Sequence, residues 1–208
     1  MEAKAVKQVN PGESLHVHGL WESTVWVNHE HRRYFIPIWR NGSTCFMYNI
    51  AEQYNYKLEK LDKDAGYIGY VYLRNPDLRI EGQLEVAIIN SERGTVEECL
   101  RRMQIPIESV PKKYYKTTGY PFDVHYKPQV NFLEGYDIKY YLDLDNLKHV
   151  GDSHIDSVTD SMKAAILLPA GINYRNPKIG NLTLKPHQKQ IIKQVYEKDY
   201  ILFKEKIK

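Results

Sequence analysis

Hydrophobic and polar positions along the chain predict a fold built mainly of β-strands. Short stretches rich in β-branched and aromatic residues alternate with turn signals, a spacing typical of β-proteins. We predict strands at 13–28, 67–74, 84–90, 113–118, 122–127, 136–144 and 163–168. The charged stretch 57–66 is predicted to be a loop.

The clearest local signal lies between residues 34 and 49. Asn41-Gly42 stands between two alternating runs, which favours a hairpin with a type I′ turn. Pro37 lies in the first run, and proline lacks the backbone donor that a central strand needs. We therefore expect a hairpin whose first strand is bulged or lies at a sheet edge.

Two segments carry helix signals. Thr95 and Glu98 have the spacing of a capping box, which predicts a short helix to about Met103. From Pro186 onward apolar residues recur at helical spacing, which predicts an amphipathic C-terminal helix with one docked face. The expected organisation is a flexible arm (1–12), a β-rich catalytic domain (13–184) and a docked C-terminal helix (185–208).

Composition narrows the protein class. An apolar fraction of 42% supports a real core, and a net charge of +3 is too small to favour binding of long nucleic acids. Two cysteines indicate a reducing compartment rather than a disulfide framework. The N-terminus lacks the apolar region of a secretory signal, and the run Ala164–Leu168 is too short to span a bilayer. We expect a cytoplasmic protein with no membrane partner.

Histidines and tyrosines are the candidate chemical groups. His16 and His18 are two residues apart in a predicted strand, so both side chains face the same way. His29 and His31 repeat that spacing, and residues 112–141 are rich in tyrosine and lysine. Histidine and tyrosine can move protons, and lysine can stabilise charge on a phosphate. These groups suffice for metal-free cleavage of a phosphodiester that has a neighbouring 2′-hydroxyl.

The paired histidines also permit a metal site. The segment PGESLHVHGLWE, with His16, His18 and Glu22, looks like the first motif of cupins. Residues 166–176 look like the second motif, but Tyr174 stands where a histidine ligand belongs. We keep this metalloprotein as an alternative and expect no metal and no cofactor.

A protease is a second alternative. Gly151-Asp152-Ser153 is similar to the nucleophile turn of chymotrypsin-like proteases, and an early histidine, His16, fits their order. However, His154 replaces the glycine that the oxyanion hole of such a turn needs. A three-residue match is weak, and a polar turn is the favoured explanation.

Four segments, spread over most of the chain, carry a family resemblance. They are ESLHVHGLWESTV (13–25), GYIGYVYLRNPDLRI (66–80), TVEECLRRMQIPI (95–107) and residues 163–169. Together they resemble the poxins, the 2′3′-cGAMP nucleases of poxviruses, baculoviruses and some insects. The resemblance implies a chymotrypsin-like β-barrel that cleaves the 3′–5′ linkage of 2′3′-cGAMP without a metal. It also implies a role in antagonising cyclic-dinucleotide immune signalling, in the host cytosol if the protein is viral.

The poxin resemblance implies a catalytic histidine, tyrosine and lysine. His16 matches the family histidine. The best local fit for the other two is Tyr126 with Lys127, and the fallback is Tyr120 with Lys116. Two departures from the family stand out: its tyrosine and lysine are four residues apart, and its Phe-Pro-Gly is replaced here by His18-Gly19-Leu20.

The expected partner is a cyclic dinucleotide, and a homodimer is left open. Polar side chains near the candidate site would contact the substrate: His18, Arg32, Arg33, Lys112, Lys113 and Tyr120. A basic, tyrosine-lined groove that binds a nucleotide without cutting it is the remaining alternative.

Overall fold

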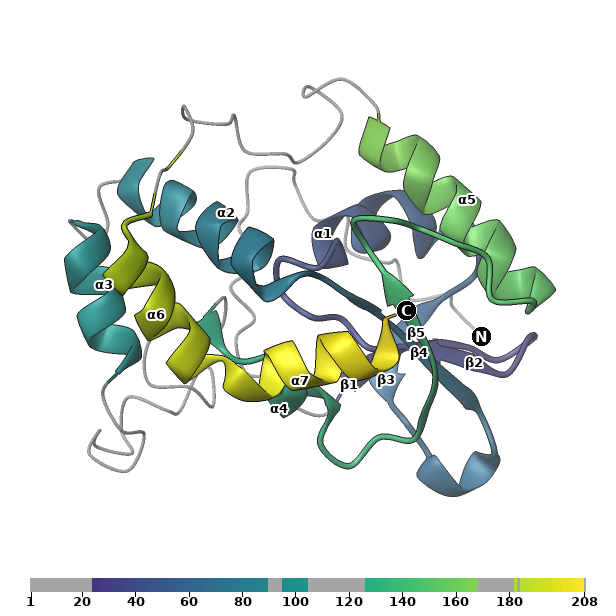
Figure 1. The fold of residues 1–208 in the computed structure, drawn as a ribbon. Coiled ribbons are helices and arrows are strands. Elements are labelled where there is room, and N and C mark those ends of the chain that lie inside the picture. The colour runs from purple at the N-terminus through teal and green to yellow at the C-terminus, as the bar shows by residue number, and fades with distance from the viewer. Residues whose placement is uncertain (1–23, 90–94, 105–125, 168–181, 183, 208) are drawn as a thin grey trace, which may run out of the picture.

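The computed structural model describes residues 24–89, 95–104, 126–167, 182 and 184–207 (Figure 1). Within this part of the chain, 49% of residues are helical and 18% are in strands, and the sheet is not closed into a barrel. The prediction of a mainly-β, chymotrypsin-like barrel is therefore wrong. The protein combines a five-stranded mixed sheet with helices.

The sheet has the strand order β3-β1-β2-β4-β5. β1 pairs antiparallel with β2 and with β3, whereas β4 pairs parallel with β2 and with β5. β3 and β5 are the edge strands. β3 has the sequence Lys-Leu-Glu-Lys, and its charged side chains discourage pairing with a further strand. The strands are β1 (Thr24–Asn28), β2 (Arg33–Phe35), β3 (Lys57–Lys60), β4 (Ile68–Leu73) and β5 (Ile138–Asp143).

β4 is the hydrophobic centre of the sheet. Tyr70 and Tyr72 pack into one cluster, whereas Val71 and Leu73 pack into another, because successive side chains of a strand point to opposite faces. All four are fully buried. A strand that is apolar on both faces needs cover on both faces, so the sheet becomes the middle of three layers.

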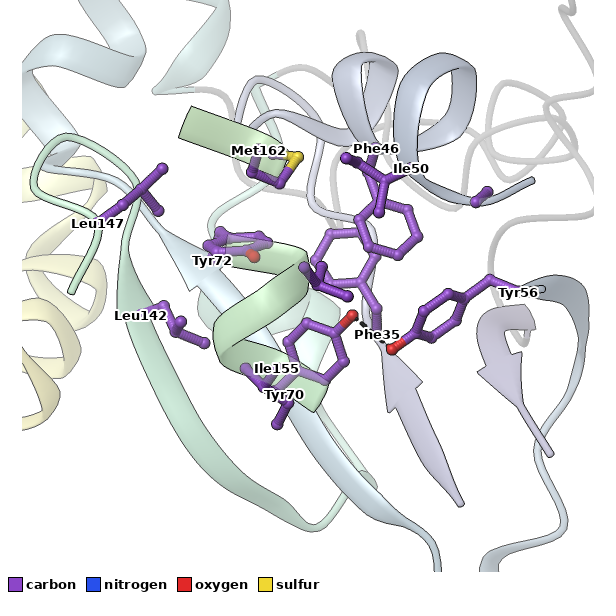
Figure 2. Close-up of a cluster of buried hydrophobic side chains, with 12 residues drawn as sticks. Phe35, Phe46, Ile50, Tyr56, Tyr70, Tyr72, Leu142, Leu147, Ile155 and Met162 are labelled. Carbon is purple, nitrogen blue, oxygen red and sulfur yellow. Dashed lines mark hydrogen bonds between the residues drawn. The ribbon is translucent and has the colours of Figure 1, made fainter. Parts of the chain in front are cut away.

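Helices supply the two outer layers. The tyrosine face of β4 is covered by α5 (Ser153–Leu167), with the short helices α1 (Ser43–Cys45) and η1 (Phe46–Ile50) (Figures 1 and 2). α5 contributes Ile155, Val158 and Met162 at helical spacing. The opposite face packs against α4 (Val130–Leu133) and α7 (Glu197–Lys206).

A third cluster lies among helices beyond the sheet. It brings together α2 (Pro76–Ile89), α3 (Val96–Met103) and α6 (Pro186–Val195). The predicted cap at Thr95 is confirmed, since the Thr95 hydroxyl accepts the Glu98 N–H at 3.3 Å and α3 follows, while the Glu98 carboxylate accepts from Arg101 at 2.9 Å. Pro186 begins α6 as expected, but the chain turns at Tyr196 and continues as α7 instead of forming one helix.

Two predicted strands are helices instead. The stretch 84–89 belongs to α2, and 163–167 is the end of α5. α2 begins at Pro76, a residue favoured at the first helical position, and buries Ile80 and Leu84 on one face. In both stretches the helix starts well upstream of the apolar run, so the run by itself resembles a strand. β3 lies within the predicted loop 57–66, and the predicted strand at 113–118 lies outside the described residues.

The predicted hairpin at 34–49 does not form. Gly42 has the expected positive φ, 76°, but it caps α1 instead of closing a turn between strands. The side chain of Asn41 is buried and donates to the carbonyl of Tyr72 at 2.9 Å. A tertiary contact to β4 therefore takes the place of the local turn.

A buried polar network joins the helical layers to the end of β4. The Asp199 carboxylate accepts the backbone N–H groups of Gln129 and Val130 at 2.8 and 3.0 Å. The Gln129 amide in turn bonds the backbone N–H and carbonyl of Arg74, both at 3.0 Å, and accepts from Asn41. Asp199, Gln129 and Asn41 are all fully buried, so each bond is protected from water.

Replacing Asp199 with alanine should lower the free energy of unfolding by about 3 kcal/mol, because two buried N–H donors lose their acceptor. The measurement is urea unfolding at pH 7. Glu205→Ala, an exposed acid on the same helix, is the matched control and should change stability by less than about 0.5 kcal/mol. Equal stabilities for the two variants would show that the network contributes little.

Candidate active site at a stacked histidine pair

The turn between β1 and β2, residues 28–33, holds its shape through side-chain hydrogen bonds. The side-chain oxygen Oδ1 of Asn28 accepts the backbone N–H of His31 at 2.6 Å, and the Asn28 side-chain Nδ2 donates to the backbone carbonyl of Tyr54. Arg32 adopts a left-handed φ of 53°, and its guanidinium donates to the carbonyl of Ala65. These contacts fix the direction in which the turn presents its histidines.

His31 stacks on His154 from the first turn of α5. The ring centroids are 3.9 Å apart and the planes are inclined by 21°. His154 is 9% exposed, whereas His31 is exposed. The stack therefore pairs an imidazole that solvent or a ligand can reach with one that is almost enclosed.

An ion pair holds the two histidines together. The Arg33 Nε and Nη2 atoms donate to Asp152 Oδ2 at 2.9 and 2.7 Å, and Arg33 Nη1 donates to the His31 carbonyl at 2.7 Å. The other Asp152 oxygen caps α5 by accepting the N–H of Ile155 at 3.2 Å. Burial opposes the ionisation of Asp152, but its hydrogen bonds with Arg33 and the backbone prevail and lower the pKa of that carboxyl.

His154 is a neutral imidazole at physiological pH. Burial, together with the charge of the neighbouring His31, lowers the pKa of His154 from 6.5 to about 4. His154 Nε2 lies 3.0 Å from the Tyr56 hydroxyl. The Tyr56 hydroxyl in turn accepts from the Tyr70 hydroxyl at 2.8 Å (Figure 2). A chain of hydrogen bonds thus runs from the stacked pair into the core.

The site combines the components of acid–base chemistry on an anion. His31 is an exposed imidazole, the side-chain type that exchanges protons near neutral pH. His154 remains neutral beside it, and the Arg33 side chain is 20% exposed. The arrangement can therefore transfer a proton next to a fixed positive charge.

The other histidine of the turn has a different environment. His29 Nε2 lies 2.7 Å from the Glu59 carboxylate on β3, and its Nδ1 lies 2.8 Å from the Tyr67 hydroxyl. The two-residue spacing of His29 and His31 suggested that their side chains lie together, but each contacts different residues. The turn directs His29 to the sheet edge and His31 to α5.

The predicted substrate contacts are only partly described. His16, His18, Lys112, Lys113 and Tyr120 lie outside the described residues. Of the two predicted arginines, Arg33 lies at the stacked pair and Arg32 turns toward Ala65.

Tyr126 and Lys127 lie among the helices. The Tyr126 side chain is 3% exposed and packs in the cluster of α2, α3 and α6. Lys127 Nζ lies 5.0 Å from the centre of the Phe132 ring. Neither residue shares a contact with His31 or His154 among the interactions that the structure describes, and their catalytic roles stay predictions.

Sequence reasoning did not assign a role to His154, Asp152 or Tyr56. The available signal is Gly151-Asp152-Ser153, which is similar to a protease nucleophile turn but is better explained as a polar turn. Gly151 has a φ of 80°, Asp152 caps α5, and Ser153 is the first residue of that helix. The motif is thus accounted for as a helix start.

The described residues offer neither a metal cluster nor a membrane span. None of them forms a group of three or more histidine, cysteine, aspartate or glutamate side chains able to hold a metal ion. The cupin-like set of His16, His18, Glu22 and Tyr174 lies outside them. In the part of the chain that the structure describes, every helix is too short or too polar to cross a membrane.

Comparison with known protein families, curated proteins and solved structures found no match to this chain.

His154→Gln should flatten the dependence of stability on pH. The pKa of His154 is about 4 in the folded protein, against an ordinary value of 6.5, so the unfolded chain binds more protons between these values. Wild-type stability should therefore fall as the pH drops from 6.5 to 4, and the variant should lose part of that fall. Urea unfolding across this range measures it.

His149→Gln is the matched control for this experiment. His149 is an exposed histidine that pairs with Asp160 at 2.8 Å, close to the same helix. The His149→Gln variant should show a slope of stability against pH that is closer to that of the wild type. An unchanged slope in His154→Gln would contradict a buried neutral His154.

Proposed function

We propose that the chain is a metal-independent nuclease that cleaves the 3′–5′ phosphodiester of 2′3′-cGAMP, with the adjacent 2′-hydroxyl of the substrate as nucleophile. The resemblance to poxins supplies the substrate and the reaction. The observation that carries the proposal is the His31–His154 stack beside Arg33. The two imidazoles can transfer protons and the Arg33 guanidinium supplies positive charge beside them, and this reaction requires both.

The reaction is balanced by one proton taken up and one given back. The 2′-hydroxyl loses its proton, its oxygen bonds to phosphorus, the bond to the 5′-oxygen breaks, and that oxygen is protonated. The exposed His31 exchanges protons with the reacting oxygens, and His154 orients its partner and the substrate. Arg33 stabilises the additional negative charge on the phosphorane. General acid–base catalysis of this kind contributes about 10²- to 10⁴-fold.

The remaining roles rest on the resemblance alone. It assigns proton transfer to His16, and activation of the 2′-hydroxyl and charge stabilisation to Tyr126 and Lys127. It also implies that the enzyme acts in the host cytosol against cyclic-dinucleotide signalling. With both His16 and His31 at the phosphate, the protein would have one proton-transfer group for the attacking 2′-oxygen and one for the departing 5′-oxygen.

The purified protein should cleave 2′3′-cGAMP at the same rate with and without EDTA. It should leave intact an analogue whose adenosine 2′-hydroxyl, the one next to the 3′–5′ linkage, is replaced by hydrogen, because the nucleophile is missing. His31→Ala and His16→Ala should each lower the rate by about 100-fold or more. His149→Ala, an exposed histidine paired with Asp160, is the matched control and should retain full activity. Chromatography of the products measures each rate.

Other outcomes identify the alternatives. Saturable binding of intact 2′3′-cGAMP would indicate a binding module, and loss of cleavage in EDTA would indicate a metal site. Cleavage that survives His31→Ala but not His16→Ala would retain the reaction and place its chemistry away from the stacked pair.

A further inference from the structure

We propose that Tyr56 and Tyr70 are positioning residues that fix His154 as the neutral tautomer protonated on Nδ1, leaving His31 as the imidazole that exchanges protons. This inference concerns the site of the proposed nuclease and rests on that function only for its effect on catalysis. The tautomer itself is a property of the free protein.

The direction of the hydrogen bonds carries the inference. Tyr70 is fully buried and donates its proton to the Tyr56 oxygen at 2.8 Å (Figure 2). A phenol has one proton, so Tyr56 retains its own for the next partner, His154 Nε2 at 3.0 Å. With Nε2 accepting, a neutral imidazole carries its proton on Nδ1.

The opposite direction of the hydrogen bond between Tyr56 and His154 is costly. If His154 Nε2 carried the proton, Tyr56 would accept twice and its own proton would need a third partner. Within the described residues the Tyr56 hydroxyl bonds only to Tyr70 and His154, and Tyr56 is 5% exposed. Leaving a buried hydroxyl proton without an acceptor costs about 1–3 kcal/mol, which favours the Nδ1 tautomer strongly.

Both phenols remain protonated throughout the working range of an enzyme. Burial raises the pKa of Tyr56 and of Tyr70 well above the usual value for tyrosine. The two hydroxyls therefore act as a fixed dipole chain and not as acids or bases. Their role is to orient His154, in the way that a hydrogen bond to one ring nitrogen orients the imidazoles of metal sites.

The surroundings of His154 disfavour a proton on that imidazole. The groups that act on His154 are His31 and Glu30 from the turn, Arg33 from β2 and Asp152 before α5. Arg33 and Asp152 carry opposite charges, so their effects on the pKa of His154 oppose one another. Two imidazoles stacked at 3.9 Å resist double protonation, and the nearly enclosed His154 is the member that stays neutral.

Nitrogen NMR of histidine-labelled protein tests the tautomer. At pH 7 the wild type should show a protonated Nδ1 and an unprotonated Nε2 for His154, with signals assigned through His154→Gln. Tyr56→Phe should convert this to a mixture in which Nε2 is also protonated. Tyr70→Phe should do the same to a smaller extent, and it serves as the second variant if Tyr56→Phe fails to fold.

Tyr54→Phe is the matched control. The Tyr54 ring packs edge-on against His154 with centroids 5.7 Å apart, but its hydroxyl bonds to Ser157 and Ser161 and not to the imidazole. This variant should leave the tautomer unchanged. A protonated Nε2 in the wild type, or the same tautomer in Tyr56→Phe as in the wild type, would overturn the inference.

Kinetics separate this inference from the function on which it builds. Tyr56→Phe should lower kcat for 2′3′-cGAMP by about 10- to 100-fold with KM little changed, the range typical of imidazole-orienting partners. A wild type with the expected tautomer but no cleavage would overturn the function and keep the positioning role. Cleavage by a protein with the opposite tautomer would overturn the positioning role alone.

Discussion

The arrangement of the helices on the sheet depends on the hydrogen bonds that the Asp199 carboxylate accepts. It is fully buried on α7, yet it accepts two backbone N–H groups from the segment that leads into α4. Through Gln129 this contact reaches the backbone of Arg74, just beyond β4. Burying a carboxylate is favourable only when its oxygens are satisfied. The C-terminal helix can therefore dock in one register, and the tyrosine-bearing strand is held with it.

The same network helps to explain where the candidate site lies. In open α/β sheets ligands bind outside the carboxyl ends of parallel strands. Here buried side chains occupy the region after β4: Asn41 and Gln129 bond there, and Arg79 donates to the carbonyls of Trp39 and Lys127. The stacked histidines instead lie at the start of β2, where α5 begins. Tyr56 and Tyr70 support them by hydrogen bonds, and both tyrosines also belong to the hydrophobic core between the sheet and α5.

The sequence predicts elements whose signals are local. β4 is a continuous apolar run, β5 lies in a tyrosine-rich stretch, and α3 begins behind the predicted cap at Thr95. The apolar end of α5 resembles a strand, because the helix starts at Ser153 behind a polar cap that resembles a catalytic turn. Asn41-Gly42 has hairpin chemistry, but a tertiary bond to Tyr72 decides its conformation.

The candidate site was less accessible to sequence reasoning than the fold. Arg33 was a predicted contact, and its partner Asp152 is 119 positions away, a separation that no local pattern reports. In the sequence, His154 stands out only because it replaces the glycine that a protease turn needs. A stack between a turn and a distant helix becomes visible once the sheet brings β2 beside α5.

The most direct test of the central claim is where a cyclic dinucleotide binds. Histidine-labelled protein would be titrated with 2′3′-cGAMP that lacks the attacking 2′-hydroxyl, so that the ligand stays intact, while the imidazole signals are followed by NMR. Saturable shifts of His31 and His154, with the exposed His149 and His187 unmoved, are the result expected. Saturable binding that leaves His31 and His154 unchanged would contradict the assignment of this pair as the active site.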